Sequence, residues 1–342
     1  MEEQSTTIQE WLSRLMRRSG FPDRWLSLEA CPACGGQRIK PAFTKWSCPH
    51  WVCETCSHGF MNPQPTPPII EEIYNSGYAR AFRKHVEIPR MRRDSDEPPI
   101  YSISEEAASA IIAGARERGP CRSWLDVGGG FGWFAKSIRD RHGVPRVGLV
   151  EIDAEAKQFA EGELKVPSIE QGDSETWDVV SAVFSLEHAA DPITFLSELS
   201  SWGKKGSTVV VCVPNFTRMN RLVAKASSAN VAPPYHLSLF CQTSLEAAAS
   251  RTGCFDEIVI EEFGGPGFKI IDIVDHADHF DITIPTEENP VSQTVCTSTY
   301  EDKDQRLADF LGTIQGRFDE FLEEVDGRES LVMYGRVGEK NP

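Results

Sequence analysis

The sequence predicts an α/β fold in which a doubly wound, mostly parallel sheet follows a small cysteine-rich module. Short apolar segments alternate with amphipathic segments from residue 102 onward, as strands and helices do when helices cover both faces of a parallel sheet. A glycine-rich turn joins the first of these strands to its helix. Two Cys-x-x-Cys pairs lie upstream, within residues 31–56.

The composition is typical of a globular protein. The 342 residues suggest two domains, and hydrophobic residues make up 40 % of the chain. No apolar run approaches the roughly 18 residues of a membrane span, and the start, MEEQSTTIQE, lacks the features of a signal peptide. We therefore expect no membrane span and a cytoplasmic location. The formal net charge of −16 disfavours nucleic acid as a partner, because phosphate would be repelled.

Residues 1–27 are predicted to form an N-terminal helix. In IQEWLSRLMRRSG, one helical face carries Trp11, Leu12, Leu15 and Met16, with three arginines nearby. Such a helix either touches a membrane surface or packs against its own protein. Packing is the favoured interpretation, since one short helix is weak support for a membrane contact.

The module at 28–65 carries a metal-binding pattern. Cys31 and Cys34 form one pair, Cys53 and Cys56 form the other, and 18 residues separate the pairs, as in four-cysteine structural zinc sites. Each Cys-x-x-Cys turn presents two thiolates to one tetrahedral ion, and four protein ligands leave no position open for substrate. We therefore predict a structural Zn²⁺ that supplies folding energy to a module too small to fold alone.

Two alternatives stand beside this ligand set. Cys48 and His50 could replace the second pair, although the pair Cys53 and Cys56 is preferred because it repeats the spacing of the first. Reduced, unligated cysteines are the other alternative, and two pairs at this spacing rarely arise by accident. The proline-rich NPQPTPPII that follows predicts a stiff, extended connection, and residues 66–118 are assigned to this linker and to helices.

The sheet domain is predicted at 119–342. Its helices are indicated by caps: Asp191 and Pro192 open one helix, whereas Thr243 and Glu246 form a predicted capping box for another. The predicted strands lie in SWLDV, PRVGLVEID, TWDVVSAVFSLEH, STVVVCVPN, FDEIVIEEFG and SLVMYGRVG, with a short one near Ile169.

The turn after the first strand predicts a ligand site, because such sheets bind ligands at the carboxyl ends of their strands. The dinucleotide fingerprint GxGxxG fails here, since Trp133 stands where its third glycine belongs. Gly128 and Gly130 still allow a ligand to lie against bare backbone. Asp126 places a carboxylate where a pyrophosphate would be repelled and a cationic group attracted.

Two further acids complete the predicted cofactor site. Glu151 ends the second strand about twenty residues after the turn, where an acid would bind ribose hydroxyls. Asp173 follows the short third strand and is placed to accept a hydrogen bond from an adenine amino group. An amino acid, a ribose and an adenine, each met by one acid, describe S-adenosylmethionine.

The stretch from about Ser123 to Gly253 resembles class I S-adenosylmethionine-dependent methyltransferases. The resemblance lies in LDVGGGFG, VGLVEID, WDVVSAVFSLEHAADP and HLSLFCQTSLEAAASRTGC, taken in this order. The cysteine module followed by GFMNPQP is similar to a subgroup with an N-terminal zinc-binding domain, often associated with sugar or secondary-metabolite methylation.

The resemblance implies a Rossmann-like methyltransferase fold with a seven-stranded sheet, whose last strand, near 331–336, is inserted antiparallel. Residues 265–329 form an insertion that the resemblance does not cover. The helical stretch 305–325 within it would cover the sheet or form a homodimer contact.

The predicted function is methyl transfer to oxygen or carbon of a small-molecule acceptor, with His236 and His188 as candidate general bases. Glu187 and His188 could instead help bind a divalent cation, but two ligands are too few to predict one. An rRNA methyltransferase is the first rival, disfavoured by the acidic charge. A non-catalytic cofactor-binding protein is the second, disfavoured by the intact glycine turn and its acids.

Overall fold

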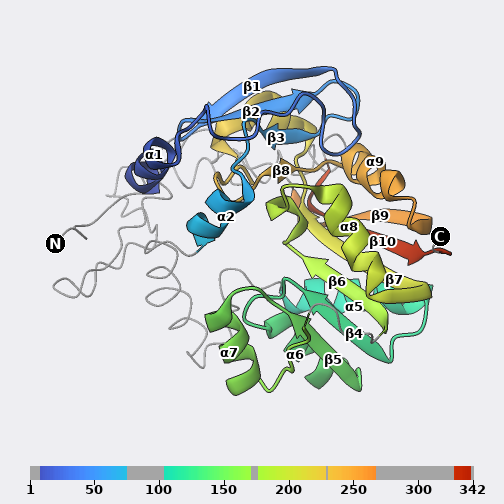
Figure 1. The fold of residues 1–342 in the computed structure, drawn as a ribbon. Helices are drawn as coiled ribbons and strands as arrows, with labels where there is room; N and C mark the ends of the chain where they lie inside the picture. Colours follow the sequence, from blue (N-terminus) through green and yellow to red (C-terminus); the bar gives the residue numbers. More distant parts are fainter. Residues whose placement is uncertain (1–7, 75–103, 171–175, 229, 267–326, 340–342) are drawn as a thin grey trace, which may run out of the picture.

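The computed structural model describes residues 8–74, 104–170, 176–228, 230–266 and 327–339, and its centre is a mixed sheet (Figure 1). The strands of this sheet are β4 (Ser123–Val127), β5 (Arg146–Val150), β6 (Trp177–Val183), β7 (Gly203–Pro214), β9 (Phe255–Pro266) and β10 (Arg328–Val337). Their order is β5-β4-β6-β7-β10-β9. The first four are mutually parallel, whereas β10 is antiparallel to both neighbours, as the resemblance implies for the last strand.

Helices cover both faces of the sheet. One face packs against α5 (Glu105–Arg118), α6 (Trp133–Asp140) and α7 (Ala154–Gly162). The other face packs against α8 (Pro192–Ser201) and α9 (Gln242–Thr252). This is the doubly wound arrangement that the alternating sequence pattern predicts.

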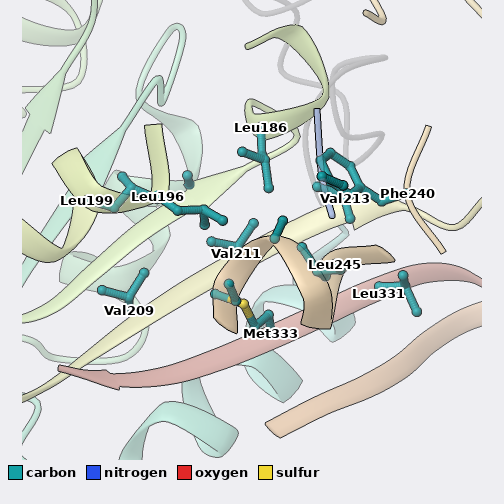
Figure 2. Packing of buried hydrophobic residues seen from close by; sticks show 14 of the residues in the cluster. Leu186, Leu196, Leu199, Val209, Val211, Val213, Phe240, Leu245, Leu331 and Met333 are labelled. Atoms are coloured by element: carbon teal, nitrogen blue, oxygen red, sulfur yellow. The ribbon is translucent and has the colours of Figure 1, made fainter. Parts of the chain in front are cut away.

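The apolar run of β7 is buried on both faces, because successive side chains of a strand point in opposite directions. Val209, Val211 and Val213 belong to the cluster that packs under α8 and α9, which Figure 2 shows around Leu245. Val210 and Cys212 belong to the cluster on the opposite face. A strand that is buried on both faces therefore has an unbroken run of apolar residues in its sequence.

The caps decide where the helices begin. Asp191 accepts hydrogen bonds from the backbone N–H groups of Ile193 and Thr194, and Pro192 occupies the first turn, which confirms the prediction for α8. The capping box predicted from Thr243 and Glu246 is wrong. The α9 helix begins earlier, with Cys241 as its N-cap, and the Ser244 hydroxyl accepts the Cys241 N–H.

The third strand of the predicted sheet is reduced to one bridge in the described residues. Leu149 of β5 pairs in parallel with Ser168, and the N–H of Ile169 donates to the Leu149 carbonyl at 2.7 Å. The described sheet therefore has six strands, and the count of seven stays a prediction.

The cysteine-rich region forms a second, antiparallel sheet. It contains β1 (Ile39–Lys45), β2 (Cys48–Cys53), β3 (Gly59–Met61) and β8 (Ser238–Leu239). The last of these strands comes from the predicted sheet domain at 119–342 rather than from the module. Figure 1 shows this sheet above α9 and the edge of the central sheet. The two parts also share a core, since Cys31 and Cys53 lie in one apolar cluster with Phe240 and Leu245.

Two short helices lie beside the second sheet, α1 (Ile8–Ser19) and α2 (Pro67–Tyr74). Leu12 and Leu15 of α1 are buried in a cluster with Ile73 of α2 and Leu237. The apolar face of the first helix is therefore covered by the protein itself.

Parts of the predicted organisation lie outside the described residues. These parts are residues 75–103 of the predicted linker and 267–326 of the predicted insertion, including the stretch 305–325. Among the helices that the structure describes, none combines the length and apolarity needed to cross a membrane.

Candidate active site

The glycine turn between β4 and α6 forms a cradle of bare backbone. Gly128, Gly130 and Gly132 have left-handed φ angles of 69°, 54° and 83°, a region that favours glycine. A Cβ atom on Gly129 would clash with the carboxylate of Asp126 and with Leu149. A Cβ atom on Gly130 would meet no described atom within 4 Å. The turn therefore opens at Gly130, where a ligand can approach the backbone.

Asp126 lies beneath this turn at the end of β4. Its side chain is 1 % exposed, and its Oδ1 accepts a hydrogen bond from the Ser181 hydroxyl at 2.7 Å. Its Oδ2 is buried without a hydrogen-bond partner in the described part of the chain. Burial raises the pKa of Asp126 to about 7, with a smaller contribution from Glu151, and the Ser181 hydrogen bond opposes the shift.

Glu151 closes the other side of the turn from the end of β5. Its Oε2 accepts from the Gly130 N–H and its Oε1 accepts from the Asp153 N–H, both at 2.8 Å. Burial raises the pKa of Glu151, and these backbone donors counteract part of that effect. Each carboxylate oxygen can accept more than one hydrogen bond, so the group retains capacity for hydroxyl donors.

Sequence reasoning missed three residues of this site. Ser181 on β6 orients Asp126, and Ser185 donates from its hydroxyl to the Gly128 carbonyl at 3.1 Å. Ile152 follows Glu151 and is 89 % exposed, although it is a large apolar residue. An isolated apolar residue between two acids was the available signal for Ile152. The predicted adenine ligand, Asp173, lies outside the described residues.

Glu187, His188 and His236 lie together, and we call them the Glu–His–His cluster. Glu187 and His188 belong to the 3-10 turn at Leu186–His188, which follows β6. His236 lies in the loop before β8. One potential ligand atom from each of the three residues lies within 4.8 Å of the other two, and the imidazole centroids are 4.9 Å apart. The structure thus brings both predicted bases to one place.

The electrostatics of the cluster keep both imidazoles neutral near pH 7. Burial lowers the pKa of His188, although the carbonyl oxygens of Tyr235 and Phe184 oppose the shift. Burial, followed by His188, lowers the pKa of His236 to about 3. Burial also raises the pKa of Glu187 to about 8. A neutral imidazole carries one lone pair, which is what a base or a metal ligand requires.

The four predicted zinc ligands converge at one end of the second sheet. The sulfur atoms of Cys31 and Cys56 are 3.7 Å apart and those of Cys34 and Cys53 are 3.6 Å apart, with all four within 4.8 Å of one another. Zn–S bonds of about 2.3 Å in a tetrahedron place sulfur atoms about 3.8 Å apart. The spacing therefore fits one tetrahedral ion.

The backbone around these sulfur atoms also fits metal binding. The N–H of Gly36 donates to Cys34 Sγ at 3.4 Å, and the N–H of Thr55 donates to Cys53 Sγ at 3.3 Å. Such donors favour the thiolate form, which is the form that binds metal. The Arg251 guanidinium of α9 also donates to the carbonyl groups of the first turn, at Pro32 and Ala33.

The alternative ligands Cys48 and His50 lie elsewhere. Cys48 is buried in the apolar cluster that contains Leu12 and Met61. The Nδ1 atom of His50 lies 3.0 Å from the Cys48 carbonyl, and neither residue belongs to the group of converging cysteines. The geometry therefore favours the pair Cys53 and Cys56 over this set.

The second sheet connects the cysteine cluster to the Glu–His–His cluster. Gly59 and Phe60 of β3 pair with β8, and the N–H of Met61 donates to the carbonyl of Leu237 at 3.0 Å. The N–H of Leu237 in turn donates to the Glu187 carbonyl at 2.8 Å. The loop that carries His236 is thus held between the module and the turn after β6.

The comparisons with known proteins bear on this half of the chain. Residues 93–256 match the family model described as "Methyltransferase domain". Over these residues, just under half of its length, the chain is similar to methyltransferase domains. The matched segment contains the glycine turn, Glu151 and all three residues of the Glu–His–His cluster. The comparison with curated proteins gives no match.

Solved structures similar to this chain include methyltransferases. A SAM-dependent methyltransferase from Archaeoglobus fulgidus is 16% identical, with a TM-score of 0.43, and the match covers 76% of this chain and 100% of that chain. Phosphoethanolamine N-methyltransferase 2 from Haemonchus contortus, in complex with S-adenosyl-L-methionine, is 15% identical, with a TM-score of 0.43. That match covers 82% of this chain and 63% of the other, which is less than two thirds. Likenesses this distant do not transfer a substrate to this chain.

Proposed function

We propose that this protein transfers the methyl group of S-adenosylmethionine to oxygen or carbon of a small-molecule acceptor, in the class of sugars or secondary metabolites. One observation carries the proposal: a left-handed turn whose backbone is open at Gly130, flanked by the acids Asp126 and Glu151, in a methyltransferase domain. An acceptor of low molecular weight suits a chain with a formal net charge of −16 better than an RNA does.

Five residues are proposed to hold the cofactor: Asp126, Gly128, Gly130, Glu151 and Asp173. The carboxylates of the first and fourth would face the amino group and the ribose hydroxyls, and the glycines leave room for close approach. Ile152 would pack against the adenine, which would explain an apolar side chain that is 89 % exposed.

The reaction needs alignment more than activation, because the sulfonium donor is already reactive. The acceptor oxygen or carbon forms the new bond to the methyl carbon while the S–CH3 bond breaks and its electron pair passes to sulfur. The acceptor proton is proposed to move to the Nε2 of His188 or His236. The hydrogen-bond geometry supports this role, because the Nδ1 of each ring faces a backbone carbonyl.

The converging cysteines are proposed to hold a structural Zn²⁺. Bound there, the ion would supply cross-linking of the two Cys-x-x-Cys turns rather than chemistry, since four sulfur ligands fill its coordination shell.

Calorimetric titration of S-adenosylmethionine into the full chain tests the proposal. We expect binding in the wild type and at least tenfold weaker binding in Glu151→Gln, because the substitution removes the charge and one oxygen acceptor from the cradle. Glu161→Gln, at an exposed position on α7, is the control and should bind as the wild type does. Failure of the wild type to bind S-adenosylmethionine, or binding of NADH in its place, would refute the proposal.

A further inference from the structure

The hydrogen bonds of His188 and His236 determine which nitrogen of each imidazole ring carries the proton. The Nδ1 atom of His188 lies 3.0 Å from the Tyr235 carbonyl, and the Nδ1 of His236 lies 2.8 Å from the Asn230 carbonyl. A carbonyl oxygen only accepts hydrogen bonds, so each Nδ1 carries the proton and each Nε2 carries the lone pair. Backbone carbonyls orient metal-binding histidines in the same way.

The third member of the cluster adds a buried acceptor. Glu187 is 2 % exposed, and its Oε1 lies 4.0 Å from the Nε2 of His188. Its Oε2 is buried and has no hydrogen-bond partner among the described residues. A buried carboxyl oxygen without a hydrogen-bond partner is costly, and a proton or a bound cation would each remove that cost.

When Glu187 is ionised, the cluster presents its carboxylate and two imidazole lone pairs to one another without a donor between them. We propose that Glu187, His188 and His236 bind a divalent transition-metal ion, with the carboxylate and the two Nε2 atoms as its ligands. Two imidazoles and one carboxylate are a ligand set that zinc and related ions accept, whereas magnesium and calcium prefer oxygen ligands alone. Three protein ligands also leave a position open, in contrast to the closed cysteine site.

The open coordination position allows the acceptor to bind directly to the ion. An acceptor hydroxyl bound there would lose its proton to solvent at a lower pH, because the cation stabilises the resulting alkoxide or phenolate. The histidines would then act as ligands, and the ion would replace them in acidifying the acceptor. This role rests on the proposed methyl transfer, whereas binding of the ion does not.

The cluster could not be predicted as a metal site from sequence, because Glu187 and His188 supply only two ligands. The third ligand, His236, is brought to the cluster by the tertiary structure. The loop that ends at Leu237 is hydrogen-bonded to the Glu187 carbonyl on one side and to Met61 of the module on the other. Pairing of β8 with β3 therefore places His236 against the turn that follows β6.

Titration of Co²⁺ into the full chain, followed by calorimetry and visible absorption, tests the proposal. Cobalt at the cysteine cluster gives sulfur-to-cobalt charge-transfer bands, whereas cobalt bound by nitrogen and oxygen gives only weak visible bands. We expect the second type of signal in the wild type and at least tenfold weaker binding at that site in His236→Gln and in Glu187→Gln. The control is His142→Gln, because His142 also lies beside a glutamate, Glu105, at 3.1 Å but outside the cluster.

The outcomes separate this inference from the proposed function. A wild type that lacks the nitrogen-and-oxygen signal, or variants at His236 and Glu187 that both retain it, would overturn the metal site. Titration of S-adenosylmethionine into the same samples reports on the cofactor cradle independently. If the chain binds the cofactor but binds no cobalt ion at the Glu–His–His cluster, the metal site is refuted. The proposed methyl transfer, with the histidines as bases, is then unaffected.

Discussion

Replacing Gly130 with alanine tests the cradle most directly, because the structure predicts two separate costs. The first is conformational: the φ angle of Gly130 is 54°, and a left-handed backbone costs a residue with a Cβ about 1–2 kcal/mol. The second concerns the cofactor. The added Cβ meets no described atom within 4 Å, so it would occupy space that the ligand needs rather than space filled by protein.

Gly143 offers a matched control for the first cost. Its φ angle is 67°, and a Cβ added there also meets nothing within 4 Å in the described part of the chain. It lies in the turn before β5, at the opposite end of that strand from Glu151. Gly130→Ala and Gly143→Ala should therefore lose similar stability, and a loss of about 1–2 kcal/mol lowers Tm by roughly 2–8 °C.

The assay is calorimetric titration of S-adenosylmethionine into both variants, with Tm measured on the same samples. We expect Kd to rise at least tenfold in Gly130→Ala, which corresponds to about 1.4 kcal/mol, and to stay unchanged in Gly143→Ala. A wild-type Kd in Gly130→Ala would show that no ligand lies against this turn. Equal weakening in both variants would show that lost stability, not lost space, explains the effect.

Two further predictions concern the cysteines and Asp126. Cys56→Ser should lower the zinc content, measured by atomic emission on the purified protein, by about one ion per chain. Cys48→Ser should retain the ion, and the reverse pattern would support the alternative ligand set. Burial raises the pKa of Asp126 to about 7, above the roughly 4 of an unfolded chain, so the folded state holds more protons in between. The free energy of unfolding contributed by Asp126 should therefore fall as pH rises from about 4 through 7, by at most about 1.4 kcal/mol per pH unit. Asp126→Asn should flatten a plot of Tm against pH over this range, and a plot parallel to that of the wild type would contradict the assigned pKa.

Part of the site could be predicted from the sequence because it depends on residues that are close together along the chain. A Cys-x-x-Cys turn brings its two sulfur atoms together by itself, and the spacing of Cys31 to Cys56 then suggests one ion. The run of glycines after Asp126 marks a turn with left-handed backbone wherever it lies in the fold. Periods of two and of 3.6 residues likewise reveal strands and helices before any packing is known.

The rest was decided by contacts between distant segments. Whether Asp126 is buried or exposed depends on β6 and the glycine turn packing around it, and nothing in its neighbouring residues reports this. The sequence assigned β8 to no sheet, because a two-residue strand has no period to detect. Its pairing with the cysteine module carries His236 to Glu187 and His188, so the ligand set of that cluster exists only in three dimensions. Local patterns determine which elements form, whereas the burial and pairing of those elements determine which side chains meet.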